Sequence, residues 1–415
     1  MHPVSLVAIL GICVATLVVG ALGLRMSRAT SDFYVAGRAI TPRRNASAIS
    51  GEYLSAASFL GVAGLVYAGG ASVLWYPIGY TVGYLVLLVL VAAPLRRSGA
   101  YTLPDFAELR LESRRLRLVC FLLTVAIGAL YLIPQYQGAG IALRAATGWP
   151  TWVGGLLVAL VVLAAVAVGG MQSITLVQAM QYWIKLTAIA VPAFVLLALW
   201  PGEHRRPLDL SAWEMPTLTS PSALYSTYST LLALCLGTMG LPHVLVRFYT
   251  NPDGRAARRT TVGVIGLIGV FYLFPPLYAV LGRTVAPDPD GRRADEIVLA
   301  LPHLFTEGPV ATVLTAILTG GAFAAFLSTA SGLVVSVAGV IDQDVLRPLL
   351  RRHTGEDSRA SASFRLASLA AVLVPLGISR LVEPLGLATT VVLAFAVAAS
   401  TFAPLLVLGV WWPRL

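Results

Sequence analysis

The segment Ser50-Gly51-Glu52-Tyr53-Leu54-Ser55-Ala56-Ala57-Ser58 places a carboxylate, a glycine and several hydroxyl groups inside a long apolar run. After Glu52, no charged residue occurs before Arg96. A carboxylate within a membrane span is energetically costly and is by default a sign of function. A helix-packing seam of small residues would account for Ala56 and Ala57 but not for Glu52. We therefore interpret the segment as a functional interruption of a membrane helix.

The composition of the whole chain is that of a membrane protein. Of its 415 residues, 57% are hydrophobic and only 12% are charged, whereas about 25% of residues are charged in soluble domains. The net charge of +10 does not indicate nucleic acid as a partner, because the basic residues lie in short loops between apolar runs. Cys13, Cys120 and Cys235 are too widely spaced for a disulfide framework or a metal site. We expect the lipid bilayer as the surrounding medium, no nucleic acid and no resident cofactor.

Eleven apolar segments have the length of membrane helices, each of which needs about 20 residues. The first lacks the basic cluster and cleavage site of a secretory signal, so we expect a retained helix. The uncharged stretch that begins at Tyr53 is too long for one crossing and is divided at 69–71. The chain is therefore predicted to be an all-α integral membrane protein. The predicted spans are 3–24, 44–69, 72–95, 117–143, 150–169, 172–200, 223–247, 258–282, 308–340, 363–382 and 385–412.

The basic residues between these spans predict the orientation of the chain. With the amino terminus outside, the basic residues of the inner loops outnumber those of the outer loops roughly three to one, which is the expected bias. The inner set includes Arg247, which we expect at the inner membrane surface. We expect a multi-pass protein of the plasma membrane, most simply the inner membrane of a bacterium.

A second interruption is predicted in the seventh span, at Leu236-Gly237-Thr238-Met239-Gly240-Leu241-Pro242-His243, because two glycines and a proline disfavour an unbroken helix. For His243 alone, a hydrogen bond to a neighbouring carbonyl is as good an explanation as a functional role. The two interrupted spans are the first spans of two five-span blocks. Because each block has an odd number of crossings, the second block enters the membrane from the opposite side. Matched interruptions in corresponding halves indicate a transporter binding site. The predicted parts are an extra amino-terminal helix at 1–27, the first repeat at 44–200, an extracellular loop at 201–222 and the second repeat at 223–412.

A third polar seam, Ala325-Phe326-Leu327-Ser328-Thr329-Ala330-Ser331, lies in the ninth span. Adjacent hydroxyls with a carbonyl one turn earlier could supply hard oxygen ligands to a small cation. Taken alone, however, such hydroxyls more often bond to carbonyls four residues earlier in their own helix. The seam does not by itself predict a site.

Several long motifs along the chain resemble one known family of transporters. They are Ser31–Arg38, Gly51–Gly61, Ala129–Gln135, Gly169–Met171, Gly240–Phe248, Leu327–Thr329 and Asp342–Asp344. In this order they resemble the sodium:solute symporter family and, within it, the cation/acetate symporters. The resemblance runs from about residue 30 to the end of the chain. It implies a leucine-transporter-like fold, a five-plus-five inverted repeat preceded by one extra helix.

The resemblance also implies two binding sites and a coupling ion, sodium. The sodium ligands would be the carbonyl oxygens of Gly51, Leu54 and Ala325 and the hydroxyls of Ser328 and Thr329. The solute would lie between the two interruptions, near Ser55, Ser58, Tyr131, Gln135, Gly237, Thr238, Gly240 and His243. Glu52 stands where acetate-type relatives usually have aspartate, and we expect Glu52 and Lys185 to form a coupling or charge pair.

These features predict a secondary active transporter that carries a small organic solute with sodium by alternating access. The N–H groups that begin the second half of the broken helix suit a small carboxylate, so the expected solute is a short monocarboxylate such as acetate. The alternatives are another solute (an amino acid, a sugar or another organic acid), a proton-coupled carrier or uniporter, and a membrane sensor derived from a transporter. An enzyme is not expected, because Glu52 and His243 are the only intramembrane candidates and no catalytic motif includes them. The oligomeric state stays open.

Overall fold

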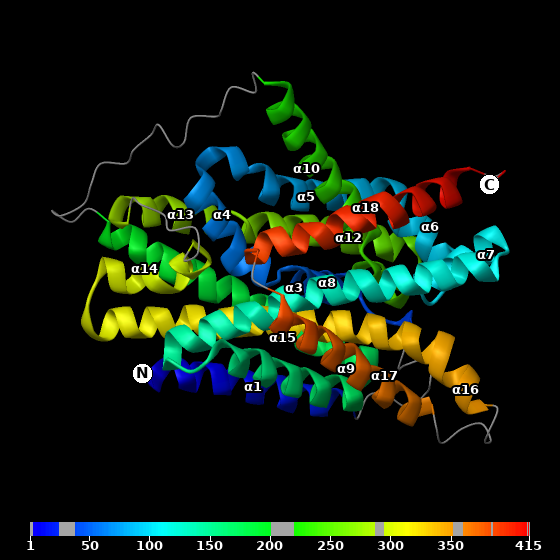
Figure 1. Cartoon of the computed structure of the whole chain (residues 1–415), viewed down its shortest axis with the longest axis horizontal. Helices are drawn as coiled ribbons and strands as arrows, with labels where there is room; N and C mark the ends of the chain where they lie inside the picture. The colour runs from blue at the N-terminus through cyan, green and yellow to red at the C-terminus, as the bar shows by residue number, and fades with distance from the viewer. Residues whose placement is uncertain are drawn as a thin grey trace.

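The computed structural model of the chain describes residues 3–24, 38–200, 220–286, 294–351, 360–382, 385–412 and 414. Within these ranges all regular structure is helical, and most helices lie along the long axis of one bundle (Figure 1). The motif at 31–37 and most of the loop predicted at 201–222 fall outside the described residues. The predicted all-α class is confirmed for the described part of the chain.

Among the described residues, eight helical segments are long and apolar enough to cross a membrane, or nine when the bent pair Pro42–Tyr53 and Ala57–Val73 counts as one span. Two further apolar helices, Trp75–Leu90 and Thr151–Val166, are shorter. The protein is therefore an integral membrane protein. The count of eleven crossings and the inverted-repeat relation between the two blocks stay predictions.

The helices begin and end near the limits of the predicted spans, with two differences. The span predicted at 258–282 is divided into the helices Gly254–Phe271 and Phe274–Val285. The helix α9 covers both the spans at 150–169 and 172–200 without a helix end between them. Glycines such as those at 169 and 170 cost a helix only about 1 kcal/mol each and do not by themselves end it. The elements used in the description are α1 (Pro3–Leu24), α3 (Pro42–Tyr53), the π-helix η2 (Ala57–Gly61), α4 (Val62–Gly69), α5 (Trp75–Leu90), α6 (Ala92–Arg97), α7 (Leu103–Leu111), α8 (Arg114–Thr147), α9 (Thr151–Leu199), α10 (Pro221–Gly240), α11 (Pro242–Val246), the 3-10 helix η5 (Arg247–Thr250), α12 (Gly254–Phe271), α13 (Phe274–Val285), α14 (Ile297–Phe305), α15 (Gly308–Ile341), α16 (Arg347–Arg351), α17 (Ala360–Leu381) and α18 (Leu387–Trp411).

The interruption predicted at 50–58 is present. The helix α3 ends at Tyr53, Leu54 has φ −73° and ψ 89°, and the chain resumes in η2 with its direction changed by 70°. A Cβ atom on Gly51 would overlap the backbone of Gln178. Glycine therefore allows the last turn of α3 to lie directly against α9.

The second predicted interruption is present in a milder form. The helix α10 ends at Gly240, Leu241 is extended with φ −69° and ψ 118°, and α11 begins at Pro242. Proline suits this first position because it fixes its own φ and has no N–H group that would need an acceptor. The short helix η5 continues α11, and its residues are buried.

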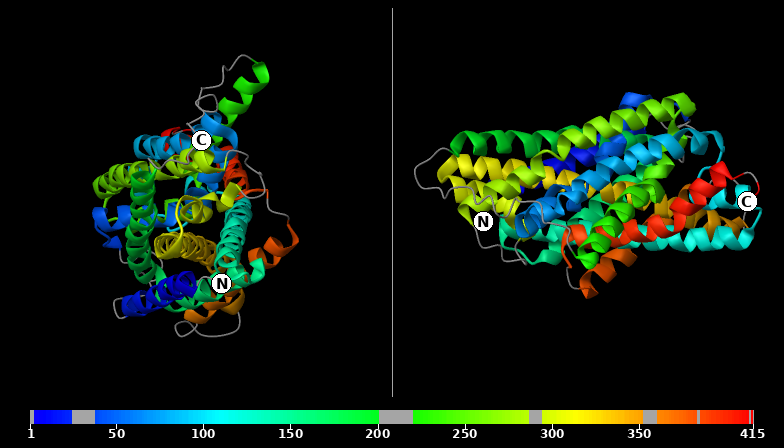
Figure 2. Two further views of the ribbon diagram at one scale, coloured as in Figure 1. Left: turned by 90° about the vertical axis from the view of Figure 1, so that its left-hand side faces the viewer. Right: turned by 90° about the horizontal axis from the view of Figure 1, so that it is seen from above.

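The helix α15 is the centre of the bundle. Every residue from Leu318 to Val340 is buried. Seen end-on, α15 (yellow) is enclosed by other helices (Figure 2). The polar seam at 325–331 therefore faces protein rather than lipid, as a polar segment in a membrane helix must.

Candidate functional site

The carbonyl groups at the end of α3 have lost their helical hydrogen-bond donors, because the helix stops at Tyr53. In a membrane protein such groups must be bonded within the protein. Side chains of three other helices supply the donors, so the break is held from three directions. The donors are Lys185 of α9 for the carbonyls of Gly51 and Leu54, Thr329 of α15 for that of Glu52, and Tyr131 of α8 for that of Tyr53.

Lys185, the only lysine of the chain, is fully buried on α9. Its Nζ atom donates to the carbonyl oxygen of Leu54 at 2.7 Å, to Ser328 Oγ at 2.8 Å and to the carbonyl oxygen of Gly51. Ser328 Oγ in turn donates to the carbonyl oxygen of Ala325 at 3.0 Å. Three of the five residues predicted as sodium ligands thus bind an ammonium group, and Ala325 is linked to them through Ser328.

Glu52 and Arg247 form a buried salt bridge beside this group. Oε2 of Glu52 lies 2.6 Å from Nε of Arg247, and each side chain is only 1% exposed. The guanidinium also donates to Thr175 Oγ1 at 2.7 Å and to Gln178 Oε1. Gly332 leaves room for the carboxylate, because a Cβ atom there would overlap Glu52.

Gln178 of α9 joins the two cationic centres. Its Nε2 atom donates to the carbonyl oxygen of Ser328 at 2.8 Å, while its Oε1 atom accepts from Arg247. Ser328 also accepts from Lys185 through its hydroxyl. A continuous hydrogen-bonded network therefore connects α9 and α15 with the break in α3 and with η5.

One prediction about the buried charges is wrong. Arg247 is not exposed at a surface but buried, because after the break at Leu241 the chain continues inside the bundle as α11 and η5. Glu52 forms its salt bridge with Arg247, while Lys185 binds the break and also interacts electrostatically with Glu52, so the predicted role of Glu52 and Lys185 as a coupling pair stays a prediction. The partner of Glu52 could have been predicted from the rule that a buried carboxylate is paired with a cation, because Arg247 lies shortly after the second break.

The main residues predicted to bind the solute lie beside the same break. The rings of Tyr131 and His243 are in contact, with centroids 5.1 Å apart. Gln135 accepts a hydrogen bond from the backbone N–H of Ala56 at 3.0 Å, and Ser55 is fully buried. Both imidazole nitrogens of His243 are buried without a hydrogen-bond partner among the described residues. The arrangement brings polar groups of α8, α11 and the α3 break together in the buried interior.

The remaining predicted solute residues have contacts of their own. Ser58 Oγ lies 2.8 Å from the hydroxyl of Tyr272. Gly237 and Gly240 allow α10 to pack closely on α18, because a Cβ atom on either would lie within 2.6 Å of a backbone carbonyl oxygen. Their part in solute binding stays a prediction.

An aromatic cluster beside the break was not predicted. The hydroxyl of Tyr53 lies 2.8 Å from Thr238 Oγ1. Its ring contacts those of Tyr80, Tyr84 and Phe395, with centroids 6.1, 4.9 and 6.0 Å away. Tyr80 and Tyr84 lie one turn apart on the same face of α5, and this spacing in an apolar run was the available signal. The cluster gives the site an apolar wall.

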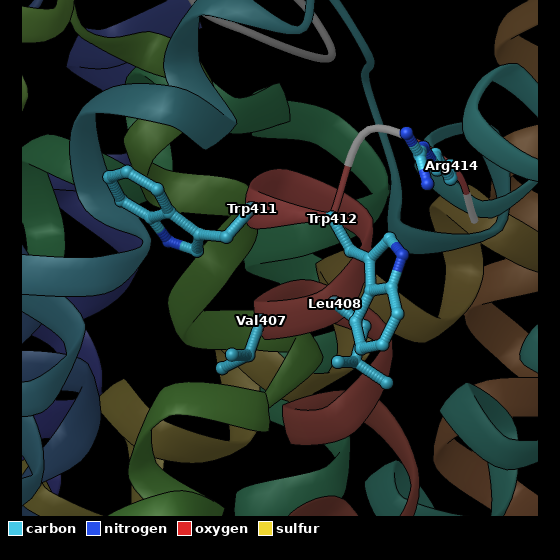
Figure 3. A pocket seen from close by; sticks show the side chains of 5 residues that line it. All are labelled: Val407, Leu408, Trp411, Trp412 and Arg414. Carbon is cyan, nitrogen blue, oxygen red and sulfur yellow. The ribbon is translucent and has the colours of Figure 1, made fainter.

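The open pocket at the end of α18 is a separate feature (Figure 3). It contains none of the predicted site residues. Both of its tryptophans are more than half exposed, as is typical of side chains at a membrane–water interface. Its lining residues are Val407, Leu408, Trp411, Trp412 and Arg414.

The family of the chain follows from comparison with known proteins. The model of the sodium:solute symporter family matches residues 33–415. The chain belongs to this family. The predicted family resemblance is thereby confirmed.

Two relatives in the symporter family are similar over most of their length. One is an uncharacterized symporter, YwcA, of Bacillus subtilis, 33% identical over 426 residues that cover 100% of this chain and 82% of the relative. The other is a monocarboxylic acid transporter of Corynebacterium glutamicum, 31% identical over 424 residues that cover 94% of this chain and 76% of the relative.

Three solved structures share the fold of this symporter. A Na+-coupled sialic acid symporter in a substrate-bound outward-open state has a TM-score of 0.68 at 15% identity, covering 99% of this chain and 87% of the other. MhsT in complex with L-phenylalanine has a TM-score of 0.65 at 16% identity, covering 88% and 87%. Mhp1, a nucleobase-cation-symport-1 family transporter in a closed conformation, has a TM-score of 0.63 at 14% identity, covering 92% and 80%. The family and the fold are those of transporters rather than enzymes.

The close fit of Glu52 against Gly332 can be tested by adding a single methyl group. We predict that Gly332→Ala lowers the free energy of unfolding by about 1–3 kcal/mol, because the new Cβ atom overlaps the Glu52 carboxylate and strains its salt bridge. Gly339→Ala, on the same helix and with no atom within 4 Å of its Cβ position, is the matched control and should be neutral or slightly stabilising. Thermal unfolding of both purified variants measures the difference. Equal melting temperatures would contradict the described fit.

Proposed function

We propose that this symporter-family protein is a secondary active transporter that carries a short monocarboxylate, such as acetate, together with a cation by alternating access. The proposal that the solute is an anion rests on one observation. Around the break in α3, the buried charged side chains of the described residues are two cations, Lys185 and Arg247, and one carboxylate, Glu52. Surplus positive charge among buried side chains favours an anionic solute, because an unpaired buried charge is costly.

The second half of the broken helix supplies a binding mode for the carboxylate. The first N–H groups of a helix have no intrahelical acceptor and carry a partial positive charge. Here they belong to Ala57 and Ser58, at the start of η2. The ring of His243 contacts that of Tyr131, whose hydroxyl donates to the carbonyl of Tyr53 just before this point, and neither ring nitrogen of His243 has a hydrogen-bond partner among the described residues. We propose that the solute carboxylate binds these N–H groups and that His243 adds a hydrogen bond.

The aromatic cluster suits the other end of a short monocarboxylate. Tyr53, Tyr80 and Phe395 present an apolar wall to the same region. An aliphatic tail of one or a few carbons would lie against these rings. The relative from Corynebacterium glutamicum, named a monocarboxylic acid transporter, supports this solute class.

The burial of the site supports alternating access. Every side chain predicted to contact the solute is at most 3% exposed, so a solute enters and leaves only when helices move. The interruptions in α3 and α10 are natural hinges, because a few residues outside helical geometry absorb changes in φ and ψ. Solved structures that share this fold include an outward-open state and a closed conformation.

The family relationship supports sodium as the coupling ion. A second candidate is a carrier that does not use sodium, such as a proton-coupled carrier or a uniporter. One observation favours this candidate, because Lys185 places a cation of the protein among the oxygen atoms where sodium is expected. Uptake measured after sodium is replaced by potassium or choline distinguishes a sodium-coupled carrier from one that does not use sodium.

Uptake of radiolabelled acetate into proteoliposomes tests the solute class. We predict saturable uptake that unlabelled propionate and pyruvate inhibit, whereas a neutral amino acid or a sugar does not, because only the acids supply a carboxylate. Liposomes without protein are the control. Absence of uptake for every short monocarboxylate would contradict the proposal.

The contact between Gln135 and the break yields a residue-level prediction. Gln135→Ala removes the acceptor of the Ala56 N–H group and should reduce kcat/KM for uptake about tenfold, the effect of losing one buried hydrogen bond. Gln137→Ala is the matched control, because Gln137 lies on the same helix but donates to the carbonyl oxygen of Val382 in an exposed hydrogen bond away from the break. Equal loss in both variants, or in neither, would contradict the assigned position of the solute.

A further inference from the structure

The ammonium group of Lys185 lies at the position that the family resemblance implies for sodium. Its Nζ atom is bound by the carbonyl oxygens of Gly51 and Leu54 and by the hydroxyl of Ser328. We infer that the cation of this site is the Lys185 ammonium itself and that the site does not take up a sodium ion. The inference concerns the cation site and is independent of the proposed solute.

The hydrogen-bonding capacity of the ammonium group is fully used. A lysine ammonium has three donors and no acceptor, and three oxygen atoms accept from it here. The other two predicted sodium ligands are also engaged: the carbonyl of Ala325 accepts from Ser328, and the hydroxyl of Thr329 donates to the carbonyl of Glu52. A sodium ion could reach these oxygen atoms only by displacing the lysine.

The surrounding charges also oppose a sodium ion. The charged group that interacts with Lys185 is Glu52 at the end of α3, and its carboxylate is already paired with Arg247 of η5 in a salt bridge. The helix opposite, α15, contains no ionisable side chain between Gly308 and Ile341. A sodium ion would therefore add a second positive charge beside the ammonium without any further carboxylate to balance it.

A cation fixed to α9 has a consequence for the transport cycle. Dissociated sodium leaves the protein and must bind again in every cycle, whereas the ammonium remains attached through the side chain of Lys185. The tie between α9, the break in α3 and α15 is then released by movement of this side chain. This site consequently contributes no sodium ion to the solute:ion stoichiometry.

Sodium binding to the purified protein, without any solute, tests the inference. The melting temperature is measured in sodium chloride and in choline chloride at equal ionic strength for the wild type, Lys185→Ala, Lys185→Ala/Ser328→Ala and the control Gln181→Ala. Gln181 is buried on the same helix but bonds to Thr16 of α1, away from the site.

We expect no sodium effect at this site in the wild type or in Gln181→Ala. In Lys185→Ala, whose oxygen ligands have lost the ammonium, sodium should raise the melting temperature saturably by roughly 3 °C or more, and the additional Ser328→Ala change should abolish the effect. A folded Lys185→Ala protein without any sodium response would overturn the inference, because the oxygen atoms would then not form a cation site.

A measurement on the wild type decides the matter even if Lys185→Ala does not fold. Binding of radioactive 22Na+ to the wild type is compared with binding to Ser328→Ala. The inference predicts that the Ser328 change removes no bound sodium. Saturable wild-type binding that Ser328→Ala abolishes would overturn it. Neither assay contains solute. Both assays therefore test the cation site even if the protein does not transport monocarboxylates.

Discussion

The structure depends on the need to hydrogen-bond the carbonyl groups that the break in α3 leaves without helical donors. Inside a bilayer an unsatisfied polar backbone group costs several kcal/mol, and neither lipid nor bulk water relieves it. The donors are side chains of α8, α9 and α15. Satisfying the break therefore fixes the relative position of four helices, and the site lies where these helices meet. An interruption that would be a defect in an isolated helix becomes the point that organises the bundle.

Buried charge is the second consequence of this arrangement. A unit charge 4 Å from another interacts with it by about 4 kcal/mol at an effective dielectric constant of 20. At this scale Glu52 and Arg247 balance one another in their salt bridge, whereas Lys185 is bound by the dipoles of carbonyls and a hydroxyl and shares the attraction of the Glu52 carboxylate with Arg247. A mobile cation added beside Lys185 would be repelled by a comparable energy, while an anionic solute would be attracted. The same lysine thus bears on both the ion and the solute that the site accepts.

The two helix interruptions could be predicted from the sequence, but the contacts that satisfy their backbone groups could not. Glycine, proline and hydroxyl residues within apolar runs act locally, so both interruptions and the polar seam of α15 could be located from the residues alone. The partner of Gly51 lies 134 residues away and that of Glu52 lies 195 residues away. Such pairs are decided by how helices pack, and Arg247 was misplaced because the seventh span was expected to end at the membrane surface. Three of the five residues that the family resemblance implies as sodium ligands bind the Lys185 ammonium, but the resemblance could not indicate that a side chain of the protein itself supplies a cation there.

The central claim is that the ammonium of Lys185 serves as the cation that satisfies the broken helix. An experimental structure of the purified protein, determined once in sodium chloride and once in choline chloride, tests this claim most directly. We expect that in both structures Lys185 Nζ lies within hydrogen-bond distance of the carbonyl oxygens of Gly51 and Leu54 and of Ser328 Oγ. A lysine turned away from the break in the sodium structure, with an ion coordinated by those three oxygen atoms in its place, would contradict it.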